Sequence, residues 1–70
     1  MQTYFTIFVN GEPFNCCDSM SLQNVLWYLN FEISNIVVEY NNEIIDRNEF
    51  SSLFLRNEDR IEIITIVGGG

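Results

Sequence analysis

Three glycines, Gly68, Gly69 and Gly70, close the sequence directly after an apolar stretch at residues 61–67. A free carboxylate is inert toward nucleophiles, but transfer of AMP from ATP gives it a leaving group, and attack by sulfur then yields a thiocarboxylate. Glycine suits such a tail because it has no side chain and adopts backbone angles closed to other residues. Residues 67–70 reach at most about 14 Å. We therefore expect the Gly70 carboxylate to be the reactive group, with Gly68 and Gly69 threading it into a partner's active site.

The remaining residue types offer little chemistry of their own. The chain has no histidine, and its two cysteines, Cys16 and Cys17, are adjacent. Neighbouring cysteines do not readily form an ordinary disulfide and lack the spacing of metal ligands. The carboxylates lie at expected turns and strand ends, where solvation is the usual state. We expect no catalytic residue, no metal site and no bound cofactor, and hence a carrier on which other enzymes act.

The charge of the chain also excludes several partners. The net charge is −7, with three arginines and no lysine among 70 residues. Phosphate neutralisation needs a basic surface, so the composition argues against nucleic acid. It suggests basic partners, and the equally weighted alternative is that the acidity only keeps a small protein in solution. No apolar run approaches the roughly 18 residues of a membrane span, so we expect no membrane contact.

Alternating and β-branched residues predict a strand-rich chain with two tight turns. Asn10-Gly11 is the strongest short hairpin signal, and Pro13 places the returning strand at a sheet edge or at its own start. Asn41-Asn42 predicts the second turn, because asparagine tolerates positive φ. The expected strands cover residues 4–9, 12–16, 36–40 and 43–45 and begin again at 61, while residues 46–54 are expected to include one helical turn that buries Phe50, Leu53 and Phe54.

One helix is predicted between the hairpin and the third strand. Ser21 has the type of an N-cap, and Asn30 or the residue after it ends the helix. Trp27 and Tyr28 are expected to flank the core rather than to bind a partner. The apolar stripe that follows the cap is Leu22, Val25, Leu26 and Leu29.

The element order predicts an α+β fold, a mixed sheet with one main helix packed on one face. The β-grasp, or ubiquitin-like, architecture fits this order and places the first and last strands side by side, parallel, at the centre. We expect one domain at residues 1–67 and a flexible glycine tail at residues 68–70. Alternation turns Phe5, Ile7, Val9, Ile61 and Ile63 toward the helix.

A single helix covers only one face of a sheet, so the other face is expected to carry a docking patch beside the tail. The alternation places Tyr4 and Phe8 on this outer face, and Ile64 and Ile66 compete for it with Glu62. An exposed apolar patch usually marks a partner site. A sheet with scattered exposed apolar residues remains the alternative. The patch is expected to contain Tyr4, Phe8, Ile64 and Ile66.

The chain resembles the ThiS family of sulfur carriers in thiamine biosynthesis. The resemblance covers nearly the whole chain and rests on residues 9–12 after the first strand, 38–45 around the second turn and 59–63 before the glycines. Two positions depart from the family: Asn42 replaces the usual glycine, and Asp46 precedes Arg47 where proline is frequent.

The resemblance implies a mechanism and a set of partners. A ThiF-type adenylating enzyme would activate Gly70 with ATP, which belongs to that enzyme. A cysteine-derived sulfur donor would convert the end to a thiocarboxylate, and thiazole synthase (ThiG) would take the sulfur for the thiazole ring. The expected location is the cytoplasm or the plastid stroma. The plastid is included because richness in asparagine and isoleucine suits an A/T-rich genome such as that of an organelle.

Three other functions stay open from the residues alone. The same fold serves as the small subunit of a molybdopterin synthase, which is also a sulfur carrier. A ubiquitin-like protein modifier would instead attach Gly70 to a lysine of a target. A plain interaction domain would make the glycines irrelevant.

Overall fold

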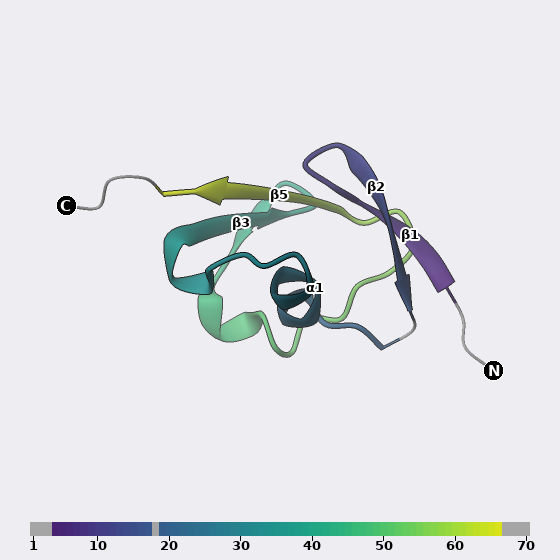
Figure 1. The fold of residues 1–70 in the computed structure, drawn as a ribbon, viewed down its shortest axis with the longest axis horizontal. Coiled ribbons are helices and arrows are strands. Elements are labelled where there is room, and N and C mark those ends of the chain that lie inside the picture. The colour runs from purple at the N-terminus through teal and green to yellow at the C-terminus, as the bar shows by residue number, and fades with distance from the viewer. Residues whose placement is uncertain (1–3, 18, 67–70) are drawn as a thin grey trace.

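The computed structural model describes residues 4–17 and 19–66. In these residues, a five-stranded sheet with the order β2-β1-β5-β3-β4 carries one helix, α1, on one face (Figure 1). The predicted α+β class and element order are confirmed. The elements are β1 (Tyr4–Val9), β2 (Glu12–Cys17), α1 (Leu22–Tyr28), β3 (Ile36–Tyr40), β4 (Glu43–Ile45) and β5 (Arg60–Thr65), with short 3₁₀ helices at Ile33–Asn35 and Arg47–Glu49.

The sheet is mixed, and β5 lies at its centre. β1 pairs with β5 in parallel, through Phe8 with Arg60 and Val9 with Ile61. All other neighbours pair antiparallel: β1 with β2, β3 with β4, and β3 with β5. The expected adjacent and parallel first and last strands are therefore confirmed, and Pro13 lies in β2, at an edge of the sheet.

Helix α1 begins and ends where the sequence predicts. The Ser21 hydroxyl accepts a hydrogen bond from the Asn24 backbone N–H at 3.2 Å, and the Asn24 side chain accepts one from the Ser21 N–H at 3.0 Å. This reciprocal pair satisfies two amides that the first turn leaves free. At the other end Asn30 has a φ of 66°, the left-handed conformation that stops many helices.

The core lies between α1 and the helix-facing side of the sheet. Ile7, Ile61, Leu22 and Leu26 are completely buried. Phe5 and Val9 pack against this core from the same side of β1, as the alternation predicts.

Three exposed aromatic residues lie around the helix and the loop that follows β4, and one of them was expected to be buried. Trp27 and Tyr28 are 58% and 71% exposed, because they lie off the buried stripe of the helix. The Tyr28 ring packs edge-on against Phe14, beside the core, as the sequence predicts. The prediction that Phe54 is buried is wrong, since 56% of this residue is exposed. The backbone at Phe54 is extended and bridges to Ser21, so Leu53 and Leu55 turn inward and Phe54 turns outward.

Candidate functional site

Strand β5 is the element that leads into the glycine tail. Gly68, Gly69 and Gly70 themselves, and the domain boundary expected at residue 67, lie outside the described residues. β5 ends at the opposite end of the molecule from the start of β1 (Figure 1). On one side it pairs with β3 at five positions, from Ile36 with Thr65 to Tyr40 with Ile61. On its other side β1 pairs with it at only two positions.

The turn between β1 and β2 holds β5 on the side where β1 pairs with it at two positions. Asn10 and Gly11 both have positive φ, 51° and 82°, as a two-residue hairpin of the primed type requires. The Asn10 N–H donates to the carbonyl of Ile61 at 2.8 Å. Its side-chain oxygen then accepts from the Ile63 N–H at 2.7 Å. The Asn10 side chain thus continues the ladder to β5 after the backbone of β1 has turned away.

The second turn holds the start of β5 from the opposite side. Asn41 donates its N–H to the Arg60 carbonyl at 2.8 Å and accepts the Arg60 N–H on its side-chain oxygen, also at 2.8 Å. Asn42 has a φ of 74°, so asparagine holds the position where the family usually has glycine. The turn predicted at Asn41-Asn42 is confirmed.

Asp59 fastens the turn that precedes β5. It is 8% exposed, and its carboxylate accepts hydrogen bonds from the Tyr40 hydroxyl at 2.7 Å and the Asn41 side-chain amide at 3.2 Å. The same carboxylate accepts from the Arg56 N–H at 2.8 Å. Burial, together with the hydrogen bond to Asp59, raises the pKa of Tyr40 to about 12. The base of the tail-bearing strand is therefore held by a buried carboxylate with three donors.

The expected docking residues do not form a single patch. Ile64 and Ile66 are 50% and 51% exposed at the end of β5. Phe8 lies beside Arg60, whose guanidinium carbon is 5.0 Å from the ring centroid. Tyr4 is 64% exposed but starts β1, four residues before Phe8, while Ile64 follows Arg60 by four residues.

At ~3.3 Å per residue, Tyr4 and Ile64 are therefore about 26 Å apart along the sheet, and Phe8 and Ile64 about half of that. The expectation that Tyr4 belongs to a patch beside the tail is wrong. Alternation assigns the face of a side chain correctly but says nothing about its position along the neighbouring strand.

Two other apolar residues of the outer face lie nearer to the tail. Val37 is directly opposite Ile64, and Ile44 of β4 is 72% exposed. Ile44 lies opposite Glu39, which in turn lies opposite Glu62. The outer face near the tail thus consists of apolar residues beside two carboxylates. The alternation of β3 and β4 could have identified Val37 and Ile44, but only once the pairing with β5 was known.

The cysteines lie on opposite faces of β2. Cys16 is completely buried. This burial is the main cause that raises the pKa of its thiol to about 11. Cys17 lies on the outer face, opposite Tyr4. Both thiols are free. Within residues 4–17 and 19–66, no group of three or more histidine, cysteine, aspartate or glutamate side chains is placed to hold a metal ion. In the same residues, no helix is long and apolar enough to cross a membrane.

A comparison with protein families covers both the strands described above and the glycine tail. A model of the ThiS family matches residues 7–70, which include β1 from Ile7 onward, the whole of β5 and the three glycines. The chain belongs to the ThiS family. The β-grasp architecture predicted from the sequence is that of the solved ThiS structures. A crystal structure of the thiamine biosynthesis protein ThiS from Geobacter metallireducens has a TM-score of 0.76 and 26% identity, over 94% of this chain and 100% of that one.

Relatives of the ThiS chain fall into two kinds. Proteins named ycf40 from Porphyra purpurea and Pyropia yezoensis are each 46% identical to it over 65 residues, 93% of this chain and 92% of the relative. A thiazole synthase of Magnetococcus marinus is 33% identical over 64 residues, but those residues are only 20% of that protein. A segment like this ThiS chain therefore occurs inside a much longer polypeptide that is named for thiazole synthesis.

Proposed function

We propose that this protein carries sulfur for the thiazole moiety of thiamine, as a thiocarboxylate at Gly70. The match of the ThiS family along residues 7–70, through the glycine tail, is the observation that carries this proposal. In the proposed cycle a ThiF-type enzyme transfers AMP from ATP to the carboxylate and releases pyrophosphate. A sulfide equivalent from a cysteine-derived donor displaces AMP. The protein is thus acted on by enzymes and is not itself one.

The second proposed partner is thiazole synthase, which would accept the sulfur. Its support is the thiazole synthase of Magnetococcus marinus, and that of Paramagnetospirillum magneticum, in each of which about a fifth of the chain resembles this protein. In these proteins a segment similar to the carrier is joined to thiazole synthase in one polypeptide, which favours a direct interaction between the two. The ycf40 names of the closely similar relatives favour the plastid stroma over the cytoplasm as the place of action.

We further propose that the outer face beside the tail guides the partners. Ile64 and Ile66 lie next to the start of the tail, and Phe8 lies on the same face further back along the sheet. Apolar side chains that are half exposed on a sheet face lose this exposure when a partner covers them, and that burial favours association. Residues 67–70 add a reach of at most about 14 Å, so a partner that takes up Gly70 must lie close to Ile66.

Intact-mass measurement tests the proposed chemistry. The protein is incubated with a ThiF-type enzyme, ATP and a sulfur donor, and a mass increase equal to replacement of one oxygen by sulfur is expected. A variant that lacks Gly69 and Gly70 serves as the control and should show no increase. Absence of the increase in the full chain, or an equal increase in the shortened one, would refute the proposal.

A further inference from the structure

Among the described residues, no strand pairs with one edge of β5 beyond Ile61. On this edge β1 ends its pairing at Ile61, and the Asn10 side chain takes the Ile63 N–H. Amides of alternate strand residues point to the same edge, so the Thr65 N–H and the carbonyls of Ile63 and Thr65 point this way too. The Ile66 N–H points to the other edge and donates to Asn35 at 2.7 Å. Within residues 4–17 and 19–66, no strand pairs with β5 on this edge after Ile61.

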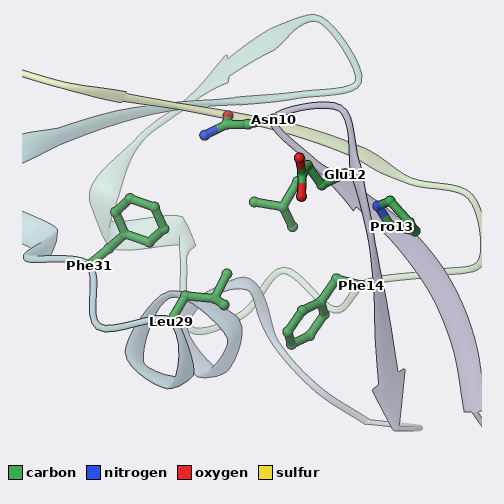
Figure 2. A pocket seen from close by; sticks show the side chains of 7 residues that line it. Asn10, Glu12, Pro13, Phe14, Leu29 and Phe31 are labelled. Carbon is green, nitrogen blue, oxygen red and sulfur yellow. The ribbon is translucent and has the colours of Figure 1, made fainter.

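A hollow of about 510 Å³ lies between the β1–β2 hairpin and the residues that follow α1, on the helix side of the sheet. Asn10, which binds Ile63, forms part of its wall and so joins the hollow to the edge. Figure 2 shows Asn10 and Glu12 on one side of the hollow and Leu29 and Phe31 on the other. Its apolar lining consists mainly of Val9, Phe14, Leu29 and Phe31.

The rim of the hollow has the composition of a protein interface. The Tyr28 ring, 71% exposed, packs edge-on against Phe14 with a centroid distance of 5.7 Å. Exposed tyrosine beside an apolar hollow is typical of residues that contribute strongly to protein binding. Glu12, one of the acidic residues that give the chain its net charge of −7, places a carboxylate at this rim. A basic side chain with an apolar stem complements such a hollow.

We propose that an extended segment of thiazole synthase adds to β5 along this edge and occupies the place that β1 leaves when it turns at Asn10. Backbone groups of the segment would bond to the Thr65 N–H and to the neighbouring carbonyls, in the way that peptides extend an exposed sheet edge. Its helix-side residues would point into the hollow, with an apolar side chain against Leu29 and Phe31 and a basic one beside Glu12.

This inference rests on the proposed function, which supplies the partner. If Gly70 enters the active site of thiazole synthase, that active site must lie within about 14 Å of Ile66, because residues 67–70 span no more than this. The unpaired edge and the hollow are the backbone and side-chain parts of the surface that the enzyme then meets. The bound segment would run along β5, the strand from which the tail extends, and would therefore also orient the tail toward the enzyme.

Two variants of Thr65 test the backbone pairing. Thr65→Pro removes the N–H that points to the open edge and leaves the bonds to β3 in place, while Thr65→Val keeps the N–H and the β-branched shape. In titration calorimetry with thiazole synthase, Thr65→Pro should bind roughly tenfold more weakly than the unchanged protein, as loss of one interface hydrogen bond predicts. Thr65→Val should bind as the unchanged protein does. Equal affinity of both variants would overturn the pairing.

Substitutions at Phe31 test the hollow independently. Phe31→Glu places a charge in the apolar lining and should weaken binding by at least about tenfold. Phe31→Leu keeps the lining apolar and should bind nearly as well as the unchanged protein. Thermal unfolding of each variant shows whether the fold survives. A folded Phe31→Glu variant with unchanged affinity would overturn the role of the hollow.

Amide hydrogen exchange gives a readout that needs no variant. The Thr65 amide should exchange fast in the free protein and slowly in the complex with thiazole synthase. Slow exchange in the free protein, or a concentration-dependent dimer that Thr65→Pro abolishes, would mean that another segment or a second copy occupies the edge, and either result overturns the proposal. If the thiocarboxylate forms but thiazole synthase leaves Thr65 unprotected, this inference fails while the proposed function stands. If no thiocarboxylate forms, the proposed function fails.

Discussion

Asn10 shows how one side chain can extend a sheet. Its backbone belongs to a turn, yet its side-chain oxygen takes the position of the next strand carbonyl and accepts the Ile63 N–H. Asn41 does the same for Arg60 on the other side of β5. The sequence showed both asparagines as turn residues, because positive φ is a local property. Their bonds to β5 could not be predicted, since these join residues that are far apart in the chain.

A glycine substitution should separate these two roles of Asn10. Asn10→Gly keeps the positive φ of the turn but removes the bond to Ile63, so we expect the free energy of unfolding to fall by about 1 kcal/mol. Urea denaturation measures this change in the free energy of unfolding. Asn42→Gly is the matched control, because Asn42 has a φ of 74° and lies in the exposed second turn, and it should be neutral or slightly stabilising. Equal stability of both variants would contradict the role of the side chain.

Tyr40 predicts a loss of stability at high pH. Its pKa is raised from 10.0 to about 12 in the folded protein, mainly by burial, so the folded state favours the neutral phenol. This contribution is fully present below the pKa of the unfolded chain and is lost as the pH rises from about 10 to about 12. Urea denaturation across this range should show the decrease.

Tyr40→Phe isolates the effect of Tyr40 from that of other groups that titrate at high pH, such as Cys16. The variant has no phenol to ionise, so its stability should fall less steeply between pH 10 and 12 than that of the unchanged protein. Parallel curves for the two proteins would argue against the raised pKa.

At the scale of elements, the sequence predicted most of the fold for a clear reason. Alternation, the Asn10-Gly11 turn and the Ser21 cap are local signals, and each appears in the expected place. The register between β1 and β5 is not local, and it decides which outer-face residues are neighbours. For this reason the faces were right while the extent of the docking patch was wrong. Phe54 was misplaced because a helical spacing was expected where the backbone is extended.

The pairing of β3 with β5 brings two like charges together. Glu39 and Glu62 are directly opposite each other on the outer face. Because like charges at this position repel, Glu62→Gln should stabilise the protein by roughly 0.2–1 kcal/mol, with a smaller gain at high salt. Thermal unfolding at low and high salt measures the effect. Glu43→Gln is the control, since Glu43 lies opposite Tyr40 and not opposite a carboxylate. A gain from Glu43→Gln as large as that from Glu62→Gln would point to net charge alone.

At the scale of the whole molecule, the position of the outer-face residues predicts graded effects on docking. Ile64→Asp should weaken binding to a ThiF-type enzyme most strongly, and Phe8→Asp should weaken it less, because Phe8 lies further from the tail. Tyr4→Asp, at the other end of the sheet, should have little effect. Surface plasmon resonance with the folded variants measures the order. If Tyr4→Asp weakens binding as much as Ile64→Asp, the docking surface extends over the whole sheet.

The placement of the two thiols has a practical consequence. Cys17 lies on the outer face and Cys16 is shut inside the core. A thiol-specific alkylating reagent should modify Cys17 readily, whereas Cys16 becomes available only when the core opens. Alkylation of Cys16 therefore serves as an intrinsic probe of unfolding. The rate at which a second alkyl group appears would report how often the whole domain opens, without any attached dye.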